Sequence, residues 1–357
     1  MTLPTTHGGT PMARTTTGRL AAALLAAGLV LAGCGGSGGD GGADGPDEIT
    51  FLNILPMESL GYAAEMVADT NGHFAEHGLE VNFEATQGSA PAIQTLLAGS
   101  AEISRIGDIE TMVAAGERGA PLVAIGSVVH RGPIRMISAE RAPVTAASDF
   151  AGKLVGTPSE GGTSSITLDL VAGSAGIPAE DVRRQVVGLS PGVFELVQAG
   201  RVDAFIVSLD TAMVLDATRP EAVVYDPNDA ISAGSQVYAT SAAMLDDPAE
   251  KDKLRRYLAA IADATRFITE DEANGFAETM RLIGSAYQVP ALADPQVATA
   301  ALSAYVESYN AGDGPTGISP QRWQATYDEI AGIGQLPAGL DPADWLDGSV
   351  AAAEATP

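Results

Sequence analysis

The feature that most constrains the fold of this chain is a repeated switch between two periods of its apolar residues. Short apolar or alternating runs, typical of strands, are separated by runs that repeat every three to four residues, as amphipathic helices do. Such alternation predicts βαβ units and mostly parallel sheets, and so an α/β protein. The predicted strands are Ile49–Leu55, Leu79–Ala85, Ala101–Ile106, Leu122–Val129, Ile134–Ser138, Leu154–Gly156, Val182–Val187, Val202–Val207 and Ala222–Tyr225.

Helical patterns fall between most of these strands and fill the last third of the chain. From Pro248 onward the pattern is helical, with prolines as interruptions. Proline ends or kinks a helix because it lacks the amide hydrogen and clashes with the preceding turn. The predicted helices before that point are Tyr62–Phe74, Pro91–Ala98, Ile109–Glu117, Thr163–Ala175, Val193–Ala199 and Thr211–Ala217.

Two segments about 100 residues apart share one pattern. Residues 93–103 and 194–204 each contain a helix stopped by a glycine, Gly99 or Gly200, then a two-residue link and a buried strand. Glycine is favoured after a last helical turn because it adopts a left-handed conformation without strain. Each strand then leads to a small-residue turn with an aspartate, Asp108 or Asp210. The repetition predicts two similar lobes.

The first residues read as an export signal. Residues 1–33 contain two arginines, no acids and a thirteen-residue apolar run, Leu20–Ala32. This run is shorter than the roughly 20 residues that span a bilayer. Leu31-Ala-Gly-Cys34 resembles the bacterial lipoprotein processing motif, in which the cysteine is lipidated and becomes the first mature residue. Either Met1 or Met12 would serve as the start of such a leader.

Cys34 is the only cysteine, so no disulfide framework is expected. Residues 34–47 are rich in glycine and are expected to act as a flexible tether. We therefore expect a body held at the outer face of the cell membrane by a lipid on Cys34. The body after the tether, about 310 residues, is long enough for two lobes.

Charge excludes one class of partner. The formal net charge is −26, and removal of the two leader arginines makes it −28. Nucleic-acid binding needs clustered Lys and Arg, so no nucleic-acid partner is expected. We expect a monomer without a metal or other cofactor. His73 and His77 have a spacing that can seat a metal on a helix, but glycines bracket them in a short turn.

Several motifs, in order and spacing, resemble a known family. Asn71-Gly-His-Phe-Ala-Glu-His-Gly-Leu-Glu-Val81 is similar to a helix-to-strand passage of periplasmic substrate-binding proteins for aliphatic sulfonates, taurine, nitrate and thiamine pyrimidines. Ser148-Asp-Phe-Ala-Gly-Lys-Leu-Val-Gly156 resembles their entry to the second lobe. Further matches, within a likeness that covers roughly residues 48–270, are Gly162-Thr-Ser164, Ala199-Gly-Arg-Val-Asp-Ala204 and Val237-Tyr-Ala-Thr240.

This resemblance implies a two-lobed periplasmic-binding-protein fold of type II, with two crossovers and a ligand cleft between the lobes. Residues 48–136 and 238–357 would form lobe 1 with the C-terminal helices, and residues 137–237 lobe 2. The crossovers would lie near Ile134–Glu140 and Ser235–Thr240. The implied function is that of a solute-binding subunit of an ABC importer, which captures a small molecule by hinge closure and delivers it to permease subunits.

In open parallel sheets, ligands bind outside the carboxyl ends of the strands. Applied to the predicted strands, this rule selects loops rich in Ser, Thr and Gly. Capping of the following helix is the alternative role of such residues. The candidate ligand-binding residues from these loops are Ser59, Ser127, Gly162, Thr163, Ser164 and Ser190.

Charged candidates decide the class of solute. Arg105 and Arg131 fall in the predicted strand-end loops, where a guanidinium can bind a sulfonate or carboxylate through two hydrogen bonds. Surface ion pairing, for instance of Arg105 with Asp108, is the alternative. Asp108 and Asp210 are further candidates, because an acid in the cleft would hold the ammonium of a zwitterion such as taurine. For Asp210, capping of the helix at Thr211 is the alternative.

Other functions remain open at this point. A thiamine-type pyrimidine or related heterocycle is an alternative solute, although few aromatic side chains are available to stack on it. Related folds include an enzyme that makes the thiamine pyrimidine, but its cysteine-rich stretch has no counterpart here. The sequence contains no nucleophile elbow, phosphate-binding loop or dinucleotide fingerprint, so catalysis is not expected. A lipoprotein scaffold that binds no ligand is the third alternative.

Overall fold

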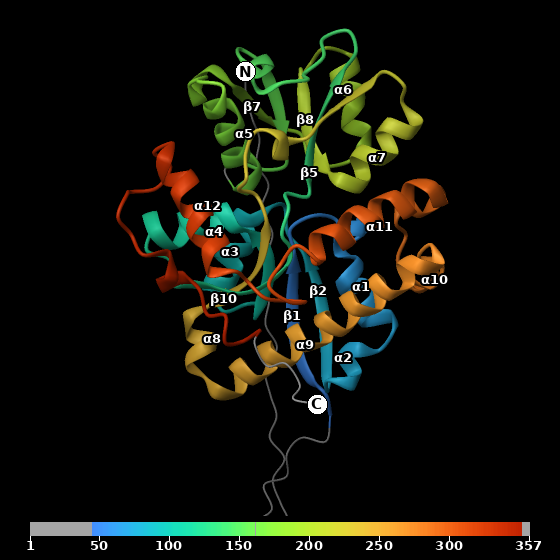
Figure 1. Ribbon diagram of the computed structural model, residues 1–357, viewed down its shortest axis with the longest axis vertical. Helices are drawn as coiled ribbons and strands as arrows, with labels where there is room; N and C mark the ends of the chain where they lie inside the picture. The colour runs from blue at the N-terminus through green and yellow to red at the C-terminus, as the bar shows by residue number, and fades with distance from the viewer. Residues whose placement is uncertain (1–44, 161, 352–357) are drawn as a thin grey trace, which may run out of the picture. The chain divides into compact units, whose positions relative to one another are not determined.

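The computed structural model describes residues 45–160 and 162–351. Residues 1–44, including Cys34 and most of the predicted tether, lie outside the described residues. Gly45–Pro357 forms one compact unit that contains two five-stranded sheets. We call the parts built on these sheets lobe 1 and lobe 2 (Figure 1).

Lobe 1 has the strand order β2-β1-β3-β10-β4. β1 pairs in parallel with β2 and β3, whereas β10 runs antiparallel between β3 and β4. All five residues of β3 are buried, as expected for a central strand covered on both faces. The strands are β1 (Asp47–Asn53), β2 (Leu79–Ala85), β3 (Ile103–Gly107), β4 (Leu122–Val129) and β10 (Gln236–Ser241).

Lobe 2 repeats this arrangement with the order β7-β6-β8-β5-β9. β6 is parallel to β7 and β8, and β5 runs antiparallel between β8 and β9. β3 and β8 therefore hold equivalent central positions, which confirms the similarity of the lobes predicted from the two repeated segments. The strands are β5 (Ile134–Ala139), β6 (Leu154–Thr157), β7 (Arg183–Val186), β8 (Ala204–Ser208) and β9 (Ala222–Tyr225).

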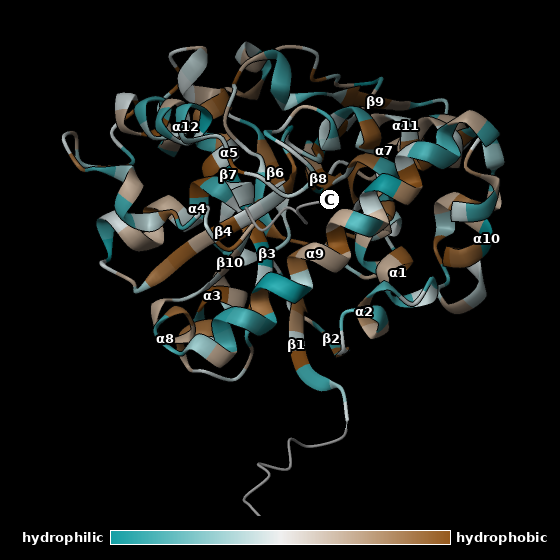
Figure 2. Cartoon of the chain, turned by 60° about the horizontal axis from the view of Figure 1, so that its bottom comes forward, coloured by the Kyte–Doolittle hydropathy of each residue, from teal (hydrophilic) through white to brown (hydrophobic). Residues whose placement is uncertain are grey.

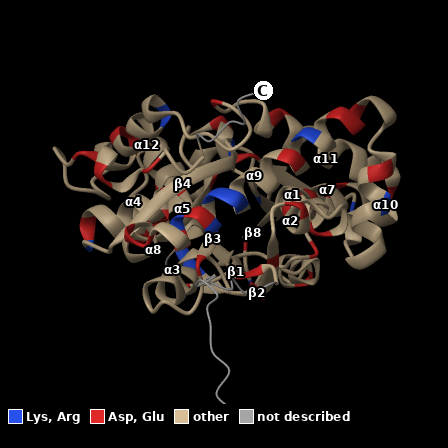
Figure 3. Ribbon diagram, turned by 90° about the horizontal axis from the view of Figure 1, so that it is seen from below, with Lys and Arg blue, Asp and Glu red and all other residues tan. Residues whose placement is uncertain are grey.

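Helices cover both sheets, and the charged positions lie mainly on their outward faces (Figures 1–3). Gly99 after α3 and Gly200 after α6 both have positive φ values, +70° and +68°, as the capping prediction requires. Lobe 1 carries α1 (Ala63–Thr70), α2 (His73–Glu76), α3 (Ser89–Leu97), α4 (Asp108–Met112), α8 (Ala242–Asp246), α9 (Pro248–Asp271), α10 (Ala277–Ala286), α11 (Pro295–Tyr309) and α12 (Pro320–Gly332). Lobe 2 carries α5 (Thr163–Ser174), α6 (Phe194–Gln198) and α7 (Leu209–Thr218).

The chain passes between the lobes twice, through residues 130–133 after β4 and residues 226–235 before β10. We call these segments the first and second crossovers. The crossovers were expected near Ile134–Glu140 and Ser235–Thr240, but most of these residues belong to the strands β5 and β10. β10 was not among the predicted strands. Gln236 and Ser241 at its ends are polar, so its sequence lacks the continuous apolar run expected of a buried strand. Within the described residues, no helix is both long and apolar enough to cross a bilayer.

Candidate functional site

The carboxyl ends of the parallel strands of both lobes face one another across a cleft. α3 and α5 begin there, one from each lobe, and their first side chains touch: Ser89 Oγ lies 3.1 Å from Thr163 Oγ1. The backbone amide of Gly107, at the end of β3, donates to the same Ser89 oxygen over 3.3 Å. The first amides of a helix have no partner within it and carry partial positive charge. The cleft therefore gathers hydrogen-bond donors from both lobes.

Gly107 allows this close contact between the lobes. A Cβ atom built at Gly107 would lie 1.8 Å from Thr163 Oγ1 and 2.5 Å from Thr163 Cβ. The backbone of Gly107 is extended, with φ −64° and ψ 140°, a conformation that any residue adopts. The glycine is therefore required by the contact between the lobes and not by its own backbone.

A second contact between the lobes involves Asp210 on α7. Its carboxylate accepts a hydrogen bond from Ser59 Oγ at 2.8 Å and another from the backbone amide of Leu60 at 3.0 Å. These groups start the helical turn that leads into α1. Asp210 was considered as the cap of its own helix, but Ser208 has that role, because its side chain accepts from the amide of Thr211. The carboxylate from lobe 2 thus occupies a helix start of lobe 1.

Two cavities lie along the cleft. The inner one, about 30 Å³, is lined by the starts of α3 and α5, including Ser89, Gly162, Thr163 and Ser164. The outer one, about 220 Å³, shares Leu55 with it. Its polar lining comprises Glu58, Ser59, Ser190, Ser208, Asp210 and Thr211. Neither lining, as far as the chain is described, includes a lysine, an arginine or an aromatic side chain.

Arg105 does not lie in a strand-end loop, as the sequence predicted, but inside β3. Its side chain is fully buried, and its guanidinium lies 3.5 Å from the buried carboxylate of Glu65 and 4.5 Å above the ring of Tyr62. It also donates to the carbonyl oxygen of Gly61. Burial opposes the charge of Arg105, but Glu65 and the nearby tyrosine hydroxyls keep its pKa above the usual value. Through its hydrogen bond to Gly61, Arg105 therefore holds in place the turn that contains Ser59 and Leu60.

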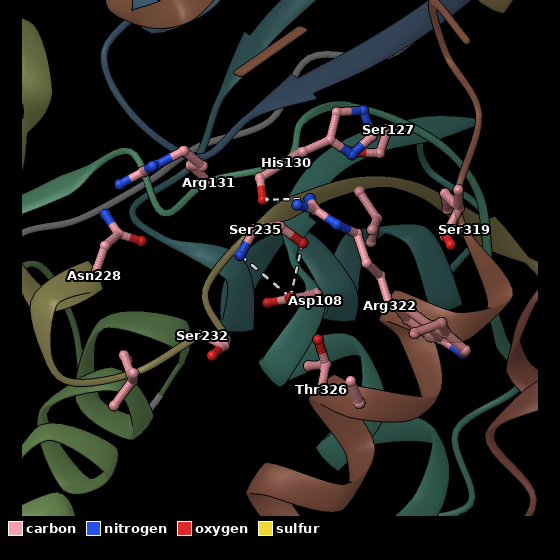
Figure 4. A pocket seen from close by; sticks show the side chains of 15 residues that line it. Asp108, Ser127, His130, Arg131, Asn228, Ser232, Ser235, Ser319, Arg322 and Thr326 are labelled. Atoms are coloured by element: carbon pink, nitrogen blue, oxygen red, sulfur yellow. Dashed lines mark hydrogen bonds between the residues drawn. The ribbon is translucent and has the colours of Figure 1, made fainter. Parts of the chain in front are cut away.

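Asp108, Ser127 and Arg131 come together elsewhere, around a third cavity of about 300 Å³ (Figure 4). We call it the hinge-side pocket, because residues of both crossovers line it together with α12. Ser127 Oγ donates to the carbonyl oxygen of Gln236 at 2.7 Å, and the Arg131 side chain is exposed. The sequence candidates thus divide between the interlobe cleft and the hinge-side pocket, with Arg105 in neither.

Two ionisable groups of the hinge-side pocket have displaced pKa values. Burial raises the pKa of Asp108 to about 6, despite hydrogen bonds from the Ser235 hydroxyl and amide and from the amide of Ile109. Burial, with a smaller effect of Arg322, lowers the pKa of His130 to about 4. The His130 ring packs against Gly312, where a Cβ atom would lie 2.0 Å from Nε2.

These shifts predict opposite effects of acid on stability. The folded-state pKa of His130 lies below its unfolded value, so its contribution to stability is lost as the pH falls from about 6.5 towards 4. The folded-state pKa of Asp108 lies above its unfolded value, so protonation stabilises the fold between about pH 6 and 4. Each change alters the free energy of unfolding by roughly 2 kcal/mol between pH 7.5 and 4.5.

Substitution of either residue removes its share of this pH dependence. From pH 7.5 to 4.5, the free energy of unfolding of His130→Gln should rise by about 2 kcal/mol relative to that of the unsubstituted chain, and that of Asp108→Asn should fall by about as much. Urea unfolding at both pH values checks this; stability differences independent of pH would contradict it.

Sequence reasoning missed several residues of these sites. Ser89 begins α3 directly after Gly88, which has a positive φ. The glycine before a helical run was the one sequence signal that could have indicated this helix start. Arg322 and Trp323 of α12 reach the hinge-side pocket from the end of the chain, and no local pattern indicates this. His77 pairs with Asp263 and His73 with Glu76. Among the described residues, no three His, Cys, Asp or Glu side chains are grouped to hold a metal ion.

Two lobes joined by two crossovers around a cleft define the periplasmic-binding-protein fold. The family model described as NMT1/THI5 like matches residues 61–274, and the chain belongs to this family. No curated protein matches the chain by sequence.

Solved structures agree with the fold. The alkanesulfonate-binding protein SsuA from Xanthomonas axonopodis pv. citri, bound to MOPS, is 15% identical with a TM-score of 0.65, covering 85% of this chain and 99% of that one. The periplasmic nitrate-binding protein NrtA from Synechocystis PCC 6803 is 13% identical with a TM-score of 0.62, covering 85% and 87%. The desulfurization enzyme DSZB is 17% identical with a TM-score of 0.56, covering 85% and 97%. The same fold thus occurs in binding proteins and in an enzyme.

Proposed function

We propose that this chain is a solute-binding subunit of an ABC importer, which captures a small solute between its lobes and delivers it to a permease. The observation that supports this most is the meeting of α3 and α5, which bring helix starts from both lobes to one point in the cleft. The fold and the sulfonate- and nitrate-binding neighbours agree with it. Closure of the lobes would enclose the solute and present both faces to the permease.

The charges of the cleft narrow the class of solute. The helix starts at Ser89 and Thr163 favour an anionic group such as a sulfonate or carboxylate, by about 0.3–2 kcal/mol each. The outer cavity contains Glu58 and Asp210, and no cation of the described residues lines it. We infer a zwitterion of the taurine type, with its anionic end at α3 and α5 and its ammonium at Asp210. Without aromatic side chains in these linings, a stacked pyrimidine is less favoured.

The proposed location, at the outer face of the cell membrane, is based on the lipoprotein-like motif Leu31-Ala-Gly-Cys34. Lipid attachment to Cys34 would hold the body outside the membrane, within reach of the permease. Mass spectrometry of the protein from a bacterial host that processes lipoproteins tests this. The expected mass is that of a chain beginning at Cys34 with a diacylglyceryl group, and a free thiol at Cys34 would contradict it.

A thermal-shift screen of the intact chain tests the solute. The panel contains taurine, alkane and aryl sulfonates, small carboxylates, nitrate and thiamine-type pyrimidines. Ligand at a thousand times its dissociation constant stabilises the folded state by about 4 kcal/mol. Taurine should stabilise the chain, and Asp210→Asn should weaken taurine binding more than alkanesulfonate binding. A shift with pyrimidines alone would overturn the proposed solute, and turnover of a bound ligand would indicate an enzyme. No shift with any member would favour a scaffold without a ligand.

A further inference from the structure

The hinge-side pocket is larger than either cavity of the interlobe cleft, at about 300 Å³ against 220 and 30 Å³. Arg131 of the first crossover, Ser232 and Ser235 of the second, and Arg322 of α12 all line it. Three segments far apart in sequence, two of them the crossovers that join the lobes, therefore meet at this pocket. A molecule bound here would contact both crossovers at once.

The pocket carries two arginines that form no ion pair with a carboxylate of the described residues. Most arginines of the described residues are in ion pairs, as expected in a chain with a net charge of −26, but Arg131 and Arg322 form none with the residues described. Both side chains are exposed. Arg322 is oriented by a 3.1 Å hydrogen bond from Nη1 to the carbonyl oxygen of His130, which leaves its other donors available. In Figure 4 the Arg322 side chain reaches across the pocket towards His130, whereas the Arg131 side chain lies at the edge of the pocket near Asn228 and points away from Arg322.

The rest of the lining suits a polar ligand. The hydroxyls of Ser232 and Thr326 make no hydrogen bond to other described residues and border the same cavity. Asp108, the one acid among the described residues that line the pocket, is buried, and its carboxylate already accepts hydrogen bonds from the hydroxyl of Ser235 at 2.7 Å and from its amide at 3.2 Å. The accessible charge of the pocket is therefore positive, within a chain that is otherwise acidic.

We propose that the hinge-side pocket is a second ligand site, which binds a small molecule with a carboxylate, phosphate or sulfonate group at Arg322, with Arg131 at the edge of the pocket as a second positive charge. A guanidinium binds such an oxyanion through two charge-assisted hydrogen bonds, and a second positive charge nearby adds to the attraction. Because both crossovers line the pocket, its occupancy biases the equilibrium between open and closed lobes. By linkage, the second ligand and the cleft solute then change each other's affinity by the same factor.

Calorimetric titration of the intact chain with inorganic phosphate, sulfate and citrate, at constant ionic strength, tests this site. The key variant is Arg131→Gln/Arg322→Gln. Arg183→Gln/Arg201→Gln is matched to it in charge, since it removes two exposed arginines of lobe 2 that form no ion pair with the described residues. Ser89→Ala/Thr163→Val removes the touching hydroxyls of the cleft and leaves the hinge-side pocket intact. Thermal unfolding of each variant first establishes that it is folded.

At least one probe should bind the unsubstituted chain saturably. Its affinity should fall at least tenfold in Arg131→Gln/Arg322→Gln and stay within twofold in the other two variants. Equal binding by Arg131→Gln/Arg322→Gln, or loss of binding in the charge-matched control, would overturn the proposal. Loss only in Ser89→Ala/Thr163→Val would assign the anion to the cleft and so also overturn it, while supporting the proposed function. No saturable binding of any probe would refute the second site and leave the cleft untouched.

Discussion

Alanine at Gly107 is expected to weaken solute binding tenfold to a hundredfold while the protein stays folded. The new methyl group would overlap Thr163, whose Oγ1 lies 1.8 Å and Cβ 2.5 Å from the position of the added carbon. The backbone of Gly107 suits alanine, so the overlap acts on the contact between the lobes. Overpacking of this kind costs about 1–3 kcal/mol, and that cost falls on the form in which α5 touches β3 and α3. Calorimetric titration with the best ligand of the thermal-shift panel measures it.

Two further variants separate closure from other effects of the methyl group. Thr163→Gly removes the three atoms that the alanine would meet, so the Gly107→Ala/Thr163→Gly chain should regain most of the affinity. Gly173→Ala on α5 places a methyl group no closer than 3.7 Å to its neighbours and should change nothing. If the Gly107→Ala chain binds as tightly as the unsubstituted chain, the solute is not held where α3 and α5 meet.

Replacement of Arg105 by methionine is expected to lower the free energy of unfolding by about 3–5 kcal/mol. The carboxylate of Glu65 would lose its ion pair and remain fully buried, with the hydroxyl of Tyr238, which donates to it at 2.7 Å, as its hydrogen-bond partner among the described residues. An unpaired buried charge is costly because the protein interior cannot solvate it. Urea unfolding gives the difference directly.

Substitution of Glu65, the partner of Arg105, provides the control. Glu65→Gln combined with Arg105→Met removes both charges and should recover a large part of the lost stability. Arg266→Met breaks an exposed ion pair with Asp263 and should cost less than about 1 kcal/mol. A loss for Arg105→Met as small as that for Arg266→Met would show that the buried pair contributes little. A strong loss of solute affinity in a chain that keeps its stability would instead place Arg105 in the binding site.

Much of the fold follows from local signals. Apolar runs such as Leu122–Val129 coincide with a strand, because continuous hydrophobicity is what a strand covered on both faces requires. Gly99 and Gly200 identified two equivalent helix ends, since the left-handed cap is a property of single residues. β10 was missed, because it enters its sheet from a distant part of the sequence and its pattern is more polar.

The site was predictable only as a set of loops. The rule that ligands lie beyond strand ends selected Ser59 and Asp210, which contact each other at the outer cavity, and Thr163, which lines the inner one. The side-chain partners were not predictable, because they depend on packing between segments far apart in sequence. Arg105 was paired with nearby Asp108 in the alternative role considered for it, whereas the structure pairs it with Glu65, forty residues away. Local spacing carries no information about such a contact.

Closure of the lobes on a solute is the central claim, and the distance between the lobes measures it most directly. Single-molecule fluorescence energy transfer on the full chain, with Cys34→Ser and dyes at Glu80→Cys on β2 and Val186→Cys on β7, reports this distance, since both positions are exposed. We expect the best ligand of the panel to raise the population of the closed state saturably, and Gly107→Ala to prevent that rise. A ligand that binds tightly and leaves the distance distribution unchanged would contradict the account.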